Sequence, residues 1–239
     1  MRTHRFYADI PLSENTSVEL PSEAAHHCAQ VLRYKVADNL TVFNGDGFDY
    51  FSEIESIAKK RCTIKIVSIK NPHNESNLKI HLLQAIARGD KMDFIFQKAV
   101  ELGVTEITPV FTERCNVKLD NKRLDKKMQH WNKTLISACE QSGRAIIPKL
   151  NLPLGINEMQ LSEIDSVYLE PTSNKKFTDS SDSQSIRLLI GPEGGLSEKD
   201  IKQLDLKGFI GIRVGPRILR TETAGLVAIS ILQNLKGDL

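Results

Sequence analysis

Two glycine-proline turns near the C-terminus are the residues whose types and spacing best suit a ligand site. The first turn, 191–195, reads Gly-Pro-Glu-Gly-Gly after the apolar segment 188–190, and the second, 215–216, reads Gly-Pro after 210–214. Glycine has no side chain, so its backbone can take positive φ angles and lie close to a bound molecule. Turns at the carboxyl ends of strands form the ligand crevice of open α/β sheets. Neither turn contains a phosphate-binding fingerprint, so the sequence favours a cofactor that carries adenosine but no phosphate.

Charged and hydroxyl residues crowd the second turn. Arg217 and Arg220 follow it closely, and Thr221 and Glu222 come next. Arginine is always protonated in proteins and can pair with negative charge. Either turn alone is readily explained as an ordinary loop, whereas two such turns together with these side chains favour a binding site.

The elements that would position the turns alternate between strand and helix. The order expected after residue 78 is strand 79–86, helix 90–102 closed by Gly103, strand 105–110, helix 121–141, strand 167–169, strand 188–190, a helix opened by Ser197, strand 210–214 and a final helix. Alternation of this kind predicts an α/β fold with a mostly parallel sheet. The segment 172–185, rich in Ser and Asp, is expected to be a mobile loop.

The final helix has apolar residues at helical spacing, and this pattern predicts one buried face. Those residues are Ala224, Val227, Ala228, Ile231, Leu232 and Leu235.

The first part of the chain has the signals of a separate β domain. Strand-like segments and an Asn-Gly-Asp-Gly hairpin turn at 44–47 dominate it. One helix, over 21–33, interrupts the strands, with Ala24, His27 and Val31 on one face. A polar, proline-containing segment follows and is the natural linker. The predicted limits are 1–70 for a small β-barrel domain, 71–77 for the linker and 78–239 for the α/β domain.

Several longer motifs resemble one known family. GPEGGLS at 191–197, followed by RVGPRILRTETA at 213–224, is similar to the cofactor-binding end of the SPOUT methyltransferases. Within that class the motifs resemble the bacterial small-subunit ribosomal RNA family that methylates uridine at N3. KMDFIFQKAVELGVTEITPV at 91–110 resembles the same family, as do RFY near the start and VLR in the first helix. The resemblance implies a SPOUT α/β trefoil-knot domain with a PUA-like β-barrel domain in front of it.

The resemblance also implies an activity and a set of site residues. A methyl group would pass from S-adenosyl-L-methionine to N3 of a uridine in 16S rRNA of the small ribosomal subunit, and the protein would be a homodimer. Arg220 and Arg217 would be catalytic by stabilising negative charge on the uracil ring, and no general base is assigned. Three loops would bind the cofactor through Leu169, Glu170, Pro171, Gly191, Pro192, Glu193, Gly194, Gly195, Val214, Gly215, Ile218, Leu219, Thr221, Thr223 and Ala224.

One basic segment is the candidate for RNA contact. Residues 114–149 contain nine Lys and Arg against three Asp and Glu, a net charge of +6, whereas the whole chain has only +2. Clustered positive charge is the footprint of phosphate-backbone binding, although a solvated helix face would explain the same pattern. The predicted RNA-binding residues are Arg5, Arg33, Lys126, Lys127, Lys133 and Arg144.

Composition argues against a membrane protein, a secreted protein and a metal-binding protein. The chain of 239 residues has 40% hydrophobic residues, and no apolar run approaches the ~20 residues of a membrane span. Its polar start is not a signal peptide, so we expect a cytosolic protein. The four cysteines are far apart and form no C-x-x-C pair, which argues against zinc and disulfides and for reduced thiols. No metal is expected.

Two other functions stay open at this point. A second kind of SPOUT enzyme methylates a ribose 2′-hydroxyl with the same cofactor. A non-catalytic RNA-binding protein could use the knotted domain only to dimerise.

Overall fold

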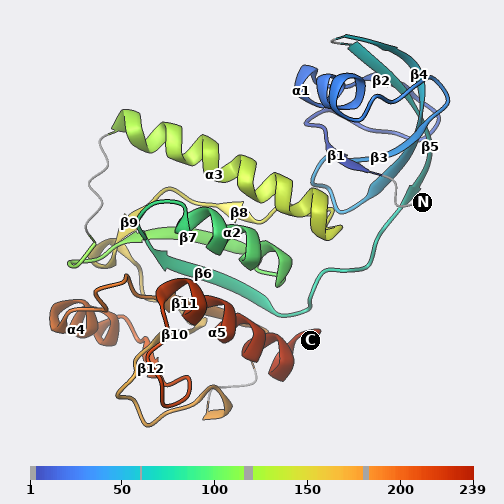
Figure 1. Ribbon diagram of the computed structural model, residues 1–239. Coiled ribbons are helices and arrows are strands. Elements are labelled where there is room, and N and C mark those ends of the chain that lie inside the picture. The colour runs from blue at the N-terminus through green and yellow to red at the C-terminus, as the bar shows by residue number, and fades with distance from the viewer. Residues whose placement is uncertain (1–3, 60, 116–120, 180–182) are drawn as a thin grey trace. The chain divides into compact units, whose positions relative to one another are not determined.

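The computed structural model describes residues 4–59, 61–115, 121–179 and 183–239 (Figure 1). The chain divides into two compact units, which we describe separately. Unit 1 comprises Met1–Glu75 and Cys139–Ile147, and unit 2 comprises Ser76–Ala138 and Pro148–Leu239. The segment Cys139–Ile147 therefore groups with the front unit, although it lies far along the sequence from it.

Unit 1 is built on a mixed five-stranded sheet of order β1-β3-β4-β5-β2. β1 pairs with β3 in parallel and the other pairs are antiparallel. Alternate residues of the longest strands are fully buried, as Ile54 of β4 and Ile64 of β5 are, which is the pattern of a sheet with one face on the core. The elements are β1 (Arg5–Tyr7), β2 (Ser17–Glu19), α1 (Ser22–His26), η1 (His27–Val31), β3 (Asn39–Phe43), β4 (Asp49–Ala58) and β5 (Arg61–Lys70).

The helix of unit 1 differs from the sequence prediction in its second half. α1 continues into η1, a π-helical turn in which Leu32 N–H donates to the His27 carbonyl at 3.0 Å. A π-helical turn holds more residues than an α-helical one, so side chains after it point elsewhere. Cys28 is buried in the core, while Val31 is 61% exposed. Ala24 is buried whereas His27 and Val31 are exposed, so the prediction that these residues share one face was wrong.

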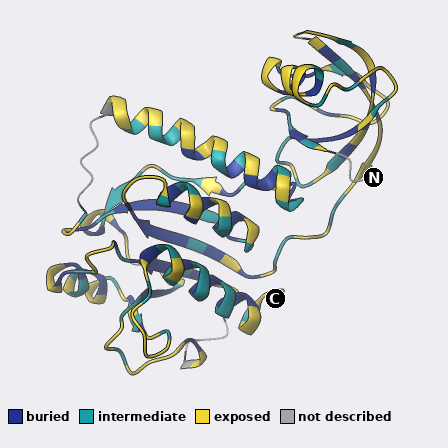
Figure 2. Ribbon diagram, in the orientation of Figure 1, coloured by how far each residue is buried: buried dark blue, intermediate teal, exposed yellow. Residues whose placement is uncertain are grey.

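Unit 2 is built on a parallel sheet of order β12-β10-β11-β6-β7-β8, with β9 also paired to β7. The described strand pairs of this sheet are all parallel, so the predicted mostly parallel α/β sheet is confirmed. Figure 2 shows its central strands buried. The strands are β6 (Lys79–Ala85), β7 (Glu106–Phe111), β8 (Lys149–Leu150), β9 (Leu154–Gly155), β10 (Asp165–Leu169), β11 (Ser185–Ile190) and β12 (Ile210–Ile212).

Helices cover both faces of this sheet, as an α/β fold requires. The helical elements are α2 (Lys91–Glu101), α3 (Asn121–Ser142), η2 (Ile156–Glu158), η3 (Phe177–Asp179), α4 (Glu198–Leu206) and α5 (Thr221–Lys236). α2 and α5 pack side by side (Figure 1). Leu204 of α4 packs with Leu83 and Leu189 on one face, whereas Gly225 of α5 lies against Ile190 and Gln84 on the other.

Two further predictions about helices in unit 2 are confirmed. α2 buries the five predicted residues Met92, Ile95, Phe96, Ala99 and Val100, and it is followed by glycine at φ +80° in the chain turn. α4 begins with the expected capping box, since the N-cap hydroxyl and the carboxylate three residues later bond reciprocally to backbone amides. Local sequence signals were therefore enough to predict the buried face of α2 and the first residues of α4.

Two predictions about the C-terminal half need correction. Of the stripe predicted for α5, Ala228 and Leu232 are fully buried, whereas Leu235 is 45% exposed. The buried face also contains Gly225, Ile229 and Gln233, which were not predicted. The segment 172–185, predicted to be a loop, contains the short helix η3, in which Phe177 is only 4% exposed, and its last residue already belongs to β11. Residues 180–182 of that segment lie outside the described residues.

Candidate active site at the carboxyl ends of three parallel strands

A cavity of about 620 Å³ lies where β10, β11 and β12 end, and these three strands are neighbours in the sheet. Its volume is within the usual range for small-molecule sites. The lining comprises Lys91, Leu169, Glu170, Pro171, Ile190, Gly191, Pro192, Glu193, Gly195, Leu196, Ile212, Val214, Gly215, Arg217, Ile218, Leu219, Arg220, Thr221 and Ala224. The structure thus brings together residues from separate parts of the chain, from Lys91 to Ala224.

The lining contains both predicted catalytic arginines and the predicted cofactor residues other than Gly194 and Thr223. Gly194 lies next to the cavity in the same turn, and an added Cβ would meet the Arg114 side chain at 3.5 Å. Thr223 is exposed. Four lining residues were not predicted: Lys91, Ile190, Leu196 and Ile212.

The glycine-rich turn after β11 is tied to the first residue of α5. Thr221 Oγ1 donates to the Gly191 carbonyl at 2.7 Å and accepts from Gln84 Nε2 at 3.1 Å. Thr221 is 5% exposed and Gln84 is fully buried. Within the turn, the Gly195 amide donates to the Pro192 carbonyl at 2.9 Å, with Gly195 at φ +70°. Hydrogen bonds in a buried setting therefore fix the backbone that faces the cavity.

Charged side chains also hold the same turn in place. Arg114 Nη1 donates to the Gly194 carbonyl at 3.0 Å. Glu193 Oε1 accepts from Lys91 Nζ at 3.1 Å and from the Arg88 amide at 3.3 Å. Burial acts to raise the pKa of Glu193, but hydrogen bonds from its own amide, Lys91 and Arg88 outweigh burial and lower that pKa. The carboxylate is therefore ionised at neutral pH, and its hydrogen bond also raises the pKa of Lys91.

The loop between β12 and α5 presents the two arginines. Gly215 is at φ +68°, which favours glycine, and its carbonyl accepts from Arg213 Nε at 3.0 Å. Arg217 and Arg220 are exposed at the cavity, with Arg220 directly before α5. Two exposed cations that line the cavity suit stabilisation of an anion that forms on a molecule bound next to it.

The cavity fits S-adenosylmethionine in the chemistry of its wall. Apolar side chains from the strand ends and loops, such as Ile190, Leu196 and Leu219, alternate with exposed backbone of the glycine turns. A purine ring can pack on the apolar groups and hydrogen-bond to the backbone, and nothing in the wall has the form of a phosphate cradle. Among the described residues no group of three metal-ligating side chains gathers, and no described helix has the length and apolar character to cross a membrane.

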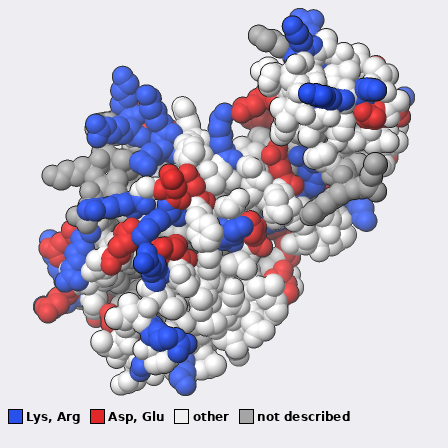
Figure 3. All heavy atoms as spheres, in the orientation of Figure 1, with Lys and Arg blue, Asp and Glu red and all other residues white. Residues whose placement is uncertain are grey.

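The predicted RNA-binding residues fall into two sets. Lys126 and Lys133 on α3 are exposed, and Lys127 Nζ lies 5.4 Å from the Trp131 ring centroid. Lys and Arg side chains gather over the first half of this helix (Figure 3). Arg33 in unit 1 is also exposed. Lys118 and Asp120 of the basic segment lie outside the described residues.

Arg5 and Arg144 form the second set, because both are committed to partners inside unit 1. Arg144 donates to both carboxylate oxygens of Glu75, at 2.9 and 2.6 Å, and its side chain is 4% exposed. Arg5 pairs with Asp49 at 2.5 Å and donates to the Cys139 carbonyl at 2.8 Å. A buried, paired guanidinium cannot reach a phosphate without losing these bonds. Both residues therefore hold Cys139–Ile147 to the front unit, which is a structural role that the sequence did not suggest.

Comparison with known proteins decides the family. The family model described as "RNA methyltransferase domain" matches residues 74–233, and "RNA methyltransferase PUA domain" matches residues 20–67. The ribosomal RNA small subunit methyltransferase E of Buchnera aphidicola (Acyrthosiphon pisum symbiont) is 38% identical over 98% of this chain and 94% of its own length. The chain belongs to the ribosomal RNA small subunit methyltransferase E family.

Solved structures agree with this assignment to the methyltransferase E family. The methyltransferase E of Neisseria gonorrhoeae bound to S-adenosyl methionine is 39% identical, with TM-score 0.93 and full coverage of both chains. A Legionella pneumophila protein in complex with its bound cofactor SAM is 40% identical, with TM-score 0.95 and full coverage. The expected fold class, a SPOUT-type α/β domain behind a PUA-like domain, is confirmed, and so is the resemblance on which it was based.

Proposed function

We propose that this protein transfers a methyl group from S-adenosyl-L-methionine to N3 of a uridine in 16S rRNA of the small ribosomal subunit. The observation that carries the proposal is the cavity formed by three loops, with Arg217 and Arg220 at its rim. The names of its relatives, and the S-adenosyl methionine bound to two solved ones, support the same substrate and cofactor.

The residues of the chain would contribute position and charge. S-adenosylmethionine, when bound, supplies an activated methyl group on a sulfonium. The turn 191–195, fixed by Thr221 and Arg114, holds one wall of the cavity in a single shape, which favours in-line approach of the reacting atoms. Arg220 and Arg217 would stabilise the negative charge that the uracil ring gains as N3 loses its proton. The uridine must leave any base pair first, because pairing covers N3.

The proposed RNA contact of the α/β unit is the exposed part of α3. Lys126, Lys127 and Lys133 lie on this helix, and lysine side chains of this kind bind phosphates without reading sequence. Arg5 and Arg144 are left out of the proposed contact because they are buried in ion pairs. The proposed setting is the cytosol, where small subunits are assembled.

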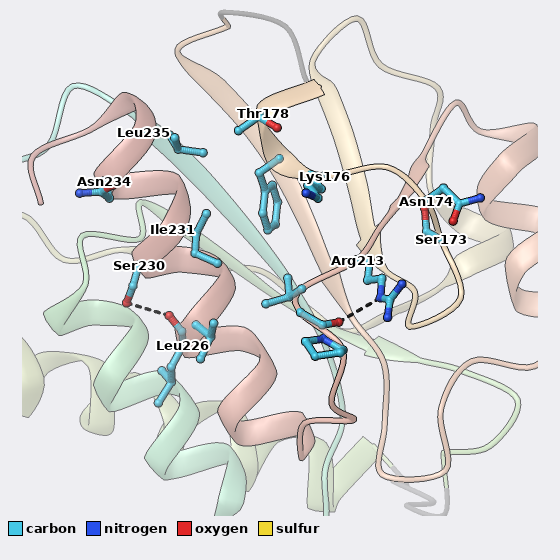
Figure 4. A pocket seen from close by; sticks show the side chains of 15 residues that line it. Ser173, Asn174, Lys176, Thr178, Arg213, Leu226, Ser230, Ile231, Asn234 and Leu235 are labelled. Atoms are coloured by element: carbon cyan, nitrogen blue, oxygen red, sulfur yellow. Dashed lines mark hydrogen bonds between the residues drawn. The ribbon is translucent and has the colours of Figure 1, made fainter.

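The proposed oligomer is a homodimer, which the partly exposed side of α5 supports. A groove of about 890 Å³ runs along this helix, and Figure 4 shows Leu226 and Ile231 pointing into it. The groove is mostly apolar and shares Val214 and Gly215 with the cofactor cavity. A second copy of the chain that covers the groove would thus also contact the loop between β12 and α5, which forms part of the wall of the cofactor cavity.

Oligomeric state and its dependence on the groove can be measured by light scattering. We expect about twice the 26.8 kDa of one chain at micromolar concentration. Ile231→Asp should give the single-chain mass, because it places a charge in an apolar interface. Leu206→Asp, on the 81% exposed Leu206 of α4, is the matched control and should stay dimeric. A wild-type mass near 26.8 kDa would refute the dimer.

The activity is tested by incubating the protein with small subunits that lack the modification and with methyl-labelled S-adenosylmethionine. Nucleoside analysis should find the label in N3-methyluridine. Label in a ribose 2′-O-methyl nucleoside would support the other enzyme class, and RNA binding without any methylation would support a non-catalytic protein.

A further inference from the structure

Lys91, at the first residue of α2, lies between two acidic residues from different parts of the chain. Its Nζ is 3.1 Å from Glu193 Oε1 in the turn after β11 and 3.5 Å from Glu222 Oε2 in the first turn of α5. Three segments that are far apart in the sequence therefore meet at one ammonium group. Lys91 also lines the cofactor cavity.

The two carboxylates depend on this ammonium to different degrees. Glu193 also accepts from the Arg88 amide. Among the described residues, no hydrogen-bond partner reaches the buried Glu222 Oε2, and the ion pair found for it is the one with the Lys91 ammonium at 3.5 Å. Because both oxygens lie close to the same nitrogen, they are less than about 7 Å from each other, a range in which like charges repel. The positive charge of the ammonium, which lies within ion-pair distance of both carboxylates, offsets this repulsion.

This bridge lies next to the contacts that shape the cofactor cavity. Glu193 belongs to the turn whose Gly191 carbonyl accepts from Thr221, and Glu222 directly follows Thr221. A shift of either carboxylate would move the turn relative to α5. Movements of about 1 Å in such a wall are enough to change binding and rate strongly.

We propose that Lys91 is a positioning residue: it holds the turn 191–195 and the start of α5 together and so sets the shape of the cofactor cavity. This role rests on the proposed function for its effect on methylation, but not for its effect on the free protein. It acts through Glu193 and Glu222 rather than through contact with the reacting atoms.

The test compares three substitutions in the full chain. Lys91→Met removes the charge and keeps the length of the side chain, and Lys91→Arg keeps the charge. Lys98→Met is the matched control, because Lys98 is on the same helix, has nearly the same side-chain exposure and forms an ion pair with Glu101 of that helix.

The first readout is amide hydrogen exchange of the free protein. Lys91→Met should speed exchange of the Gly195 amide, which bonds within the turn, about tenfold or more. Lys98→Met should leave it at the wild-type rate. Unchanged exchange in Lys91→Met would overturn the proposal, whatever the protein catalyses.

The second readout is the Kd for S-adenosylmethionine by calorimetry. Lys91→Met should raise it about tenfold, whereas Lys91→Arg should stay within about threefold of wild type. The double variant Lys91→Met/Glu222→Gln should bind more tightly than Lys91→Met, because the repulsion between two carboxylates is gone. Equal binding of the double and single variants would instead mean that Lys91 touches the cofactor, and would overturn a positioning role. If wild type does not bind S-adenosylmethionine, the proposed function fails, while hydrogen exchange still decides the role of Lys91.

Discussion

Thr221 is a residue whose replacement should separate the architecture of the site from its chemistry. Its hydroxyl joins three segments of the chain. From the start of α5 it donates to the Gly191 carbonyl in the turn after β11 and accepts from Gln84 Nε2 at the end of β6. Thr221→Val keeps the shape and the branching of the side chain but removes both hydrogen bonds. The substitution therefore measures the hydroxyl alone.

The size of the effect follows from what is left unpaired. Gln84 is fully buried, its Nε2 keeps only the Ala85 carbonyl at 3.0 Å, and its Oε1 already has no partner. The Gly191 carbonyl loses the hydroxyl that bonded it at 2.7 Å. A buried polar group that loses its partner costs about 1–3 kcal/mol. Since both groups keep some other contact or access to water, we expect a loss of about 2–3 kcal/mol and a Tm lower by about 4–12 °C.

The assay is urea unfolding together with calorimetric titration of S-adenosylmethionine. Thr134→Val is the matched control, because the Thr134 hydroxyl bonds only the exposed His130 carbonyl one turn back in α3, and it should cost less than about 0.5 kcal/mol. Thr221→Val should also weaken cofactor binding, because the Gly191 carbonyl is free to move. If both variants lose the same stability, or if Thr221→Val binds the cofactor as wild type does, the hydroxyl does not fix the turn.

Three further substitutions test other parts of the molecule. Arg220→Ala should lower kcat about 100-fold or more if the guanidinium stabilises charge in the transition state, and a wild-type rate with saturating cofactor and RNA would exclude that role. Replacing Lys126 and Lys127 with Ala should weaken RNA binding and reduce its salt slope by at most about one per lost phosphate contact; an unchanged slope would mean that α3 does not touch RNA. Burial lowers the pKa of His81, so the folded protein binds a proton less readily than the unfolded chain. Stability should be complete above about pH 6.5 and fall as pH decreases toward that lowered pKa, and His81→Gln should flatten this decrease in urea unfolding.

The sequence was most informative where backbone chemistry alone decides the structure. Gly191, Gly195 and Gly215 are needed where the chain turns sharply next to a cavity, and two of them have positive φ in the structure. Because parallel strands end at the same edge of a sheet, residues that follow different strands meet without any signal of their own. The two glycine-proline loops of the cavity could therefore be predicted from turn motifs and strand order, whereas the loop at Glu170 and Pro171 came only from the family resemblance.

Residues whose role depends on a distant partner could not be predicted in this way. Lys91 reads as an ordinary residue at a helix start, and only the fold brings it to Glu193 and Glu222. Arg144 reads as part of a basic segment, but it is buried with Glu75. A charge in a sequence does not show whether it is solvated or paired, since the cost of burial disappears only when the right partner is adjacent.

The final helix shows why periodicity identified only part of the buried face: Ala228 and Leu232 are fully buried as predicted, but the rest of the predicted stripe is not. The apolar stripe that contains Ile231 and Leu235 is the strongest signal in α5, but the face buried within one chain contains Thr221 and Gln233. Gln233 is fully buried because its Nε2 donates to the Leu102 carbonyl at 2.9 Å and its Oε1 accepts from the Ser76 hydroxyl at 2.7 Å. Hydrogen bonds satisfy this polar side chain, so it is buried at little cost. One side of α5 is thus buried against its own sheet with its polar groups hydrogen-bonded, and the other side is apolar and partly exposed. Both sides can therefore be buried, as expected for a helix that lies between its own sheet and a second subunit.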